Sequence, residues 1–206
     1  MTQTMRRILF FAVLLLFSIH IQAQDSDMLG KIRQANATVQ SFETTLNNTL
    51  VKPNKKTEQK GMLYFVNPDK FAALFDNGKH MIVNVDRLKM NIGLFRGTFR
   101  LKGDGMMRSL SNIFLYGFQG RCQELAQENN YSIKVIDTGQ YQQVYCTSNK
   151  KSLFGIGYKT VIFNYDKDSF LLRQIILVDN SDNVDTYTIT NTRYNVPVSD
   201  ERFFIK

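Results

Sequence analysis

The sequence contains few residues that could support acid–base, nucleophilic or metal chemistry. Of its two histidines, only His80 lies outside the first 23 residues, and no Ser or Cys that could act as its nucleophile is near it in the sequence. One histidine without an H-E-x-x-H or C-x-x-C pattern does not make a typical zinc site. We therefore expect no metal, no cofactor and no enzymatic activity.

Two predicted turns of the sequence are rich in acidic residues. The segment from Asp179 to Asp185 resembles the opening of a calcium-binding loop, but Val184 stands where such a loop needs glycine, so we interpret the segment as a turn. Asp166 and Asp179 lie on different predicted turns and could act as an acid and base pair. An unrecognised hydrolase therefore stays an alternative.

Cys122 and Cys146 are the only cysteines. In an exported chain they could form a disulfide, which would close a loop of 146 minus 122, or 24, residues. Such a bridge could stabilise the fold by about 3 kcal/mol in the chain-entropy description. A cysteine at a helix start and one at a strand end could equally be two separate buried thiols.

The elements that would position these residues begin with the stretch from Gly61 to Val85, which predicts three short antiparallel strands joined by turns. Apolar residues fill alternate positions of both parities, so both faces of this sheet need cover. Strand parity places Tyr64 and Leu74 on one face. The other, concave, face is predicted to be lined by Phe42, Leu46, Leu63, Phe65, Phe71, Ala73, Phe75, Met81 and Val83.

A helix from Met106 to Phe118 is predicted by apolar residues at spacings of three and four. Its apolar stripe is wider than packing on one sheet face requires. It could be an ordinary core helix, or a movable lid with flexible ends at Gly103, Gly105 and Gly117 whose Met and Phe side chains adapt to a ligand. The ligand-contacting candidates on this helix are Met106, Leu110, Ile113 and Phe114.

The rest of the chain predicts an α+β fold rich in antiparallel strands. A short helix is expected near each of the ranges Asp27 to Asn36 and Arg121 to Asn129. Strands are expected from about Val39 to Val51, Leu88 to Phe95, Tyr131 to Ile136, Gln140 to Thr147, Lys159 to Tyr165, Phe170 to Val178, Asp185 to Asn191 and Phe203 to Ile205.

The N-terminus has the pattern of a secretory signal peptide. Arg6 and Arg7 precede an apolar stretch that ends near Ile19, and Ala23 is the small residue expected at a cleavage site. We expect residues 1–23 to be the signal peptide and residues 24–206 to form a single domain. The stretch is shorter than the ~20 apolar residues of a membrane-spanning helix, so a permanent anchor is the weaker alternative.

The composition supports one globular domain and argues against nucleic-acid binding. The chain has 206 residues, of which 43% are hydrophobic, and a formal net charge of +8. Its Lys and Arg residues are scattered and do not form the stripe that marks a nucleic-acid site.

The order and spacing of several residues along the chain resemble the periplasmic outer-membrane lipoprotein carrier proteins, the LolA-like family. The residues that carry the resemblance are Val39, Ser41 and Phe42, then Gly61, Leu63, Phe65, Pro68 and Phe71, then Asn77, Gly78 and Lys79, then Phe163, Asp166, Leu171, Ile175, Asp179 and Thr186, and finally Asn195, Val196, Phe203 and Ile205. The resemblance implies a curved, unclosed antiparallel half β-barrel whose concave face is covered by helices. Members often carry Arg where Asn67 precedes Pro68, so a closed state latched by that Arg is not implied here.

The function implied by the resemblance is that of a periplasmic carrier or chaperone. It would shield lipoprotein acyl chains, or another envelope lipid, in a hydrophobic cavity during transfer from the inner to the outer membrane. Its partners would be an inner-membrane release complex and an outer-membrane acceptor, and we expect a monomer. A sensor or interaction module for envelope lipids or lipoproteins, built on the same scaffold, is the alternative.

Overall fold

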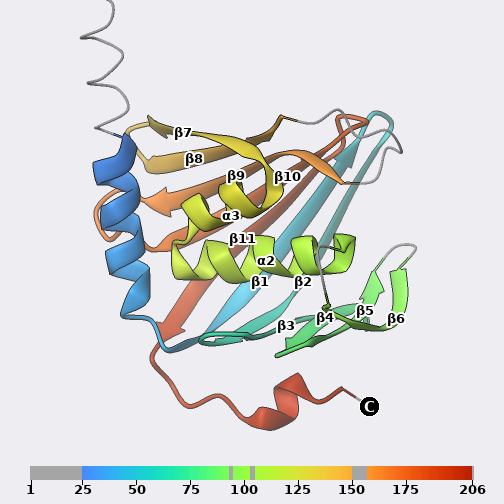
Figure 1. The fold of residues 1–206 in the computed structure, drawn as a ribbon. Helices are drawn as coiled ribbons and strands as arrows, with labels where there is room; N and C mark the ends of the chain where they lie inside the picture. Colours follow the sequence, from blue (N-terminus) through green and yellow to red (C-terminus); the bar gives the residue numbers. More distant parts are fainter. Residues whose placement is uncertain (1–24, 93–94, 103–104, 150–156, 206) are drawn as a thin grey trace, which may run out of the picture.

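The computed structural model describes residues 25–92, 95–102, 105–149 and 157–205. The predicted signal peptide lies outside these residues. Eleven strands form one antiparallel sheet in the order β6-β5-β4-β3-β2-β1-β11-β10-β9-β8-β7 (Figure 1). Within the described chain its two edge strands, β6 and β7, do not pair with each other, so the sheet is unclosed. The predicted α+β class with an open antiparallel sheet is confirmed.

The strands follow one another as hairpins in two halves that meet where β1 pairs with β11. The first half contains β1 (Ser41–Lys52), β2 (Lys55–Val66), β3 (Lys70–Phe75), β4 (His80–Asn84), β5 (Arg87–Ile92) and β6 (Phe95–Arg100). The second half contains β7 (Tyr131–Asp137), β8 (Tyr141–Ser148), β9 (Tyr158–Asp166), β10 (Leu172–Asp179) and β11 (Val184–Tyr194). The prediction of a single strand from Leu88 to Phe95 is wrong, because β5 ends at Ile92 and Phe95 begins β6.

Three α-helices in the described residues lie on the concave side of the sheet (Figure 1). They are the helix of residues 25–37, α2 (Met106–Gln119) and α3 (Cys122–Asn129). Rings of α2 and the sheet are in direct contact: Phe118 lies 5.2 Å from Phe42 and Phe114 lies 5.4 Å from Phe71, measured between centroids. The predicted helix over residues 106–118 is therefore confirmed, and its apolar stripe faces the sheet. None of the helices in these residues has the length and hydropathy needed to cross a membrane.

On the opposite, convex face of the sheet, the C-terminal segment covers part of strands β2 to β4. Phe203 is buried against a second apolar cluster that includes Tyr64, Ala72 and Ile82. The Asn84 side chain donates a hydrogen bond to the Phe203 carbonyl. The predicted strand from Phe203 to Ile205 is wrong: the chain forms a 3-10 helix, η1 (Asp200–Phe203), because it packs across the sheet as a cover and pairs with none of its strands.

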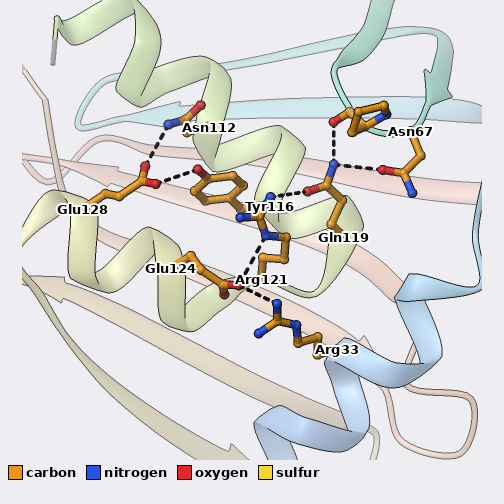
Figure 2. A network of polar contacts seen from close by, with 9 residues as sticks. Arg33, Asn67, Asn112, Tyr116, Gln119, Arg121, Glu124 and Glu128 are labelled. Carbon is orange, nitrogen blue, oxygen red and sulfur yellow. Dashed lines mark hydrogen bonds and ion pairs between the residues drawn. The ribbon is translucent and has the colours of Figure 1, made fainter. Parts of the chain in front are cut away.

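The C-terminal end of α2 is held by a polar network (Figure 2). The Gln119 side chain donates hydrogen bonds to the Asn67 side chain and the Pro68 carbonyl in the turn between β2 and β3. Arg121 donates to Gln119 and Glu124, and Glu124 also pairs with Arg33 of the N-terminal helix at 2.9 Å. The network joins α2, α3, the helix of residues 25–37 and the sheet at one place.

Close backbone packing fixes the same end of α2. Gly120 ends the helix in the left-handed conformation with φ 66°, and a β-carbon there would come 2.7 Å from the Ile32 carbonyl oxygen. Gly117 approaches Phe163 with similar closeness. The prediction that Gly117 provides a flexible helix end is therefore wrong. Of the other two glycines in that prediction, Gly105 is the N-cap residue of α2, and Gly103 lies outside the described residues.

Candidate functional site

A cavity of about 470 Å³ lies between the N-terminal half of α2 and the sheet. This volume falls within the ~300–1,000 Å³ that is usual for small-molecule sites. Phe95 and Met106 line it although 37% and 39% of their surfaces remain exposed, so the cavity reaches the protein surface beside them.

Most of the cavity wall is apolar, and its apolar residues come mainly from strands β4 to β6 and from α2, with one residue each from β1 and β10. Unbranched Met side chains are prominent in it, and such side chains adapt their shape to irregular apolar ligands. The apolar lining consists of Leu50, Met81, Met90, Ile92, Phe95, Met106, Met107, Leu110, Ile113, Phe114 and Leu177.

Five of the thirteen residues predicted to contact a ligand line this cavity. They are Met81 on β4 and Met106, Leu110, Ile113 and Phe114 on α2. The prediction that the Met- and Phe-rich helix borders a space next to the sheet is consistent with their placement.

The other eight predicted residues lie on the concave side but do not line the cavity. Leu46, Leu63 and Ala73 border only a void of about 10 Å³ beneath Phe114. Phe42, Phe65, Phe71, Phe75 and Val83 are buried in the core cluster. Sequence parity places residues on a face, but it does not indicate where along that face α2 packs directly and where it leaves a space.

Most of the polar part of the wall comes from the ends of β1, β7, β9, β10 and β11, and α2 adds Ser109. Asp185 is the more enclosed of the two carboxylates there: it accepts hydrogen bonds from Asn48 Nδ2 and from Tyr187 Oη, the latter at 2.8 Å. Burial raises the pKa of Asp185 above its ordinary value of 3.8, against the opposing effect of these two hydrogen bonds. Burial likewise raises the pKa of the neighbouring Tyr158 hydroxyl.

Asp179 is held differently, by its own turn. It accepts hydrogen bonds from the Ser181 and Asn183 backbone amides and from the Asn183 side chain. Burial opposes its ionisation, but the hydrogen bonds from Asn183 and Ser181 outweigh burial and lower its pKa. The interpretation of this segment as a turn agrees with these contacts, and no group of three or more potential metal ligands occurs in the part of the chain that the structure describes.

The polar lining was not predicted. Its residues are Lys52, Ser109, Tyr131, Tyr158, Asp179, Asn183, Asp185 and Tyr187. Alternation in the C-terminal strands does indicate that Tyr187 faces inward. No local signal shows that Asp185 reaches the same cavity as Met106, since that depends on pairing between β1 and β11, where Leu50 lies opposite Asp185.

The acid and base pair considered for a hydrolase does not come together. Tyr165, next to Asp166, lies opposite Leu172, whereas Asp179 lies opposite Tyr158. The two aspartates therefore sit at opposite ends of β9 and β10, roughly 23 Å apart at ~3.3 Å per residue. His80 begins β4, where its Nδ1 lies 3.3 Å from the Gly78 carbonyl oxygen.

The two cysteines are free and buried in the structure. The Cys122 thiol lies 3.2 Å from the Tyr165 hydroxyl, which donates to the Gly117 carbonyl at 2.9 Å. Burial raises the pKa of the Cys122 thiol to about 12 and also raises that of Cys146, so neither is a reactive thiolate near neutral pH. The structure thus shows the second of the two alternatives, separate buried thiols.

The fold is similar to those of several solved bacterial proteins, whereas no protein family matches the sequence and no curated protein is significantly similar to it. A DUF1329 family protein from Desulfovibrio piger is 16% identical, with a TM-score of 0.48 over 89% of this chain and 97% of that chain. A LolA superfamily protein from Nitrosomonas europaea is 11% identical, with a TM-score of 0.43 over 88% and 97%. The Mycobacterium tuberculosis lipoprotein LppX is 14% identical, with a TM-score of 0.39 over 85% and 98%. The similarity lies in the general arrangement of the sheet and helices.

Proposed function

We propose that the protein is an exported carrier that shields the acyl chains of a lipoprotein, or of another envelope lipid, in the cavity beneath α2. The observation that carries this proposal is the apolar wall of a cavity of about 470 Å³ that reaches the surface beside Phe95 and Met106. A soluble protein of this size normally fills its interior, so an apolar space of this volume suits an apolar ligand.

The free energy available from such a cavity is sufficient for binding. Sixteen methylene carbons at ~0.8 kcal/mol each would contribute on the order of 13 kcal/mol before the loss of translational and conformational freedom is subtracted. A single acyl chain therefore suffices for useful affinity. The Met side chains at positions 81, 90, 106 and 107 allow chains of different shape to be accommodated.

The way α2 is held against the sheet indicates where a ligand would enter the cavity. The C-terminal end of α2 is fixed by Gly117, Gly120 and the network around Gln119, while the N-terminal end carries the cavity-lining residues. Any opening should therefore occur at the Met106 end. In this proposal residues 24–206 are the mature periplasmic domain, and the release complex and the acceptor are the partners that load and empty it.

Native mass spectrometry of the protein purified from a host that exports it tests the proposal. We expect the mature protein with a bound species whose mass and fragments identify an acyl lipid or an acylated peptide. Recovery of only the empty protein, together with failure to take up added acyl lipid, would contradict the carrier function. Capture of a protein partner in that case would favour the sensor or interaction module.

A further inference from the structure

The polar residues of the cavity wall, apart from Ser109 of α2, are gathered at one end. Leu50 of β1 lies opposite Asp185 of β11, and Asp179 of β10 lies opposite Tyr158 of β9. The same ends of four neighbouring strands therefore supply these side chains, together with Lys52 and Asn183. Most of the apolar wall lies toward β4 to β6 and α2, and the exceptions, Leu50 and Leu177, lie opposite Asp185 on the two neighbouring strands. Most polar lining residues therefore lie at one end of the cavity and most apolar ones at the other.

Within the polar end, Asp185 is the carboxylate that has unfilled hydrogen-bond acceptor positions. Each of its oxygens accepts one hydrogen bond, from Asn48 and from Tyr187, whereas a carboxylate oxygen can accept two. Asp179, by comparison, accepts three hydrogen bonds from its own turn. No Lys, Arg or His of the described ranges lies within ion-pair distance of Asp185.

The charge of the polar end determines which ligand head groups it can bind. Asp179 and Asp185 outnumber the single cation, Lys52, and Lys52 is exposed. A ligand group that donates hydrogen bonds would complete the unfilled acceptor positions of Asp185. A free carboxylate would instead be repelled, because two like charges at a partly buried site are destabilising.

We propose that the polar end binds the head group of the acyl ligand, that Asp185 accepts a hydrogen bond from it, and that the head group is a donor such as an alcohol or an ammonium group and not a carboxylate. This inference rests on the proposed function, since it assumes that an acyl chain occupies the apolar end. The carried lipid would then be an acylglycerol-type or amine-bearing lipid, and free fatty acid would be a poor ligand.

Three ligands with the same sixteen-carbon chain test the inference on the delipidated mature protein at pH 7.5: 1-hexadecanoylglycerol, hexadecylamine and hexadecanoic acid. We expect the glycerol ester, the amine, or both to bind about tenfold or more tightly than the acid, the fold-change typical of a hydrogen bond to a charged group. In Asp185→Asn the preference over the acid should fall to within about threefold. Which of the two donors binds more tightly distinguishes an alcohol head group from an ammonium head group.

Asp182→Asn is the matched control. Asp182 lies on the same turn between β10 and β11, its side chain is 79% exposed and pairs with Lys159, and it does not line the cavity. This variant should retain the wild-type preference. Circular dichroism and melting temperature establish that both variants are folded.

The outcomes separate the inference from the proposed function. If the wild-type protein binds none of the three ligands, the carrier function fails. If the wild-type protein binds all three ligands equally, or if Asp185→Asn keeps the wild-type preference, the cavity binds acyl chains but Asp185 does not select the head group. Only the inference about the head group is then overturned. The wild-type comparison decides this even if Asp185→Asn does not fold.

Discussion

Gly117 of α2 lies so close to Phe163 of β9 that a β-carbon on Gly117 would come 2.6 Å from the Cε1 atom of the ring. At this position α2 packs directly against the sheet, with no room for a side chain on Gly117. Gly117→Ala should therefore force the helix or the ring to move and lower the free energy of unfolding by about 1–3 kcal/mol.

Urea unfolding followed by circular dichroism measures this change. Gly30→Ala is the control, because Gly30 lies in the helix of residues 25–37 with nothing within 4 Å of its added β-carbon. That variant should stabilise the protein by about 0.5–1 kcal/mol through helix propensity. Equal effects of the two substitutions would contradict the close-packing explanation.

The C-terminal cover of the convex face gives a second prediction. Phe203 is 1% exposed and packs with Tyr64, Ala72 and Ile82, whereas the adjacent Phe204 is 63% exposed. Phe203→Ala should lower the free energy of unfolding by about 3–5 kcal/mol. Phe204→Ala should change it by less than about 0.5 kcal/mol. Chemical denaturation of the two variants compares them directly, and similar stabilities would show that the segment does not cover the sheet.

Substitution by glutamate should have different effects on residues of the cavity wall and residues of the core. Leu110 lines the cavity and is half-buried, so Leu110→Glu should leave the protein folded. It should reduce the affinity for 1-hexadecanoylglycerol at least about tenfold, because the bound ligand would remove water from a carboxylate in the apolar wall. Phe71 is fully buried against Phe114 and Phe118, so Phe71→Glu should unfold the protein.

Melting curves and ligand titrations measure both effects. Arg108→Glu, at an exposed position of α2 outside the cavity lining, is the control and should bind normally. A folded Leu110→Glu variant with wild-type affinity would show that the ligand does not bind in this cavity.

Asp185 should make the empty protein less stable as the pH rises. Because burial raises its pKa above 3.8, the folded state holds the proton more tightly than the unfolded state. Between the two pKa values the folded protein binds more protons, so this contribution to stability is fully present below the unfolded pKa and is lost as the pH rises through the folded pKa.

The difference in unfolding free energy between wild type and Asp185→Asn isolates this contribution from that of the other carboxylates. We expect Asp185→Asn to gain stability relative to wild type as the pH is raised from about 4 to 7. The unfolding free energy of Asp182→Asn should change with pH in parallel with that of the wild type. If the unfolding free energy of Asp185→Asn also changes with pH in parallel with that of the wild type, burial does not raise the pKa of Asp185.

Local signals in the sequence were sufficient to predict the antiparallel strands and α2, whereas the open shape of the sheet was implied only by the resemblance to the LolA-like family. The turns at Asn67–Asp69 and Asp76–Gly78 separate β2, β3 and β4, and the spacing of apolar residues over 106–118 is helical. Strand parity also places Phe71 on the side of α2 and Tyr64 on the convex side.

The cavity itself could not be located in this way. Its polar end depends on pairing between Leu50 and Asp185, which are far apart in the chain, and the cover of the convex face depends on the C-terminal segment folding back as η1. The apolar run at the C-terminus resembles a strand, and only the position of Phe203 over Tyr64 and Ile82 shows it to be a cover. Long-range packing of this kind leaves no local pattern.

The central claim is that the apolar cavity binds an acyl chain, and a chain-length series tests it most directly. Calorimetric titration of the delipidated protein with monoacylglycerols of increasing length should show affinity rising with each added methylene, by up to ~0.8 kcal/mol, until the chain fills the cavity. Binding should also have a negative heat-capacity change. An affinity that does not depend on chain length would contradict the claim.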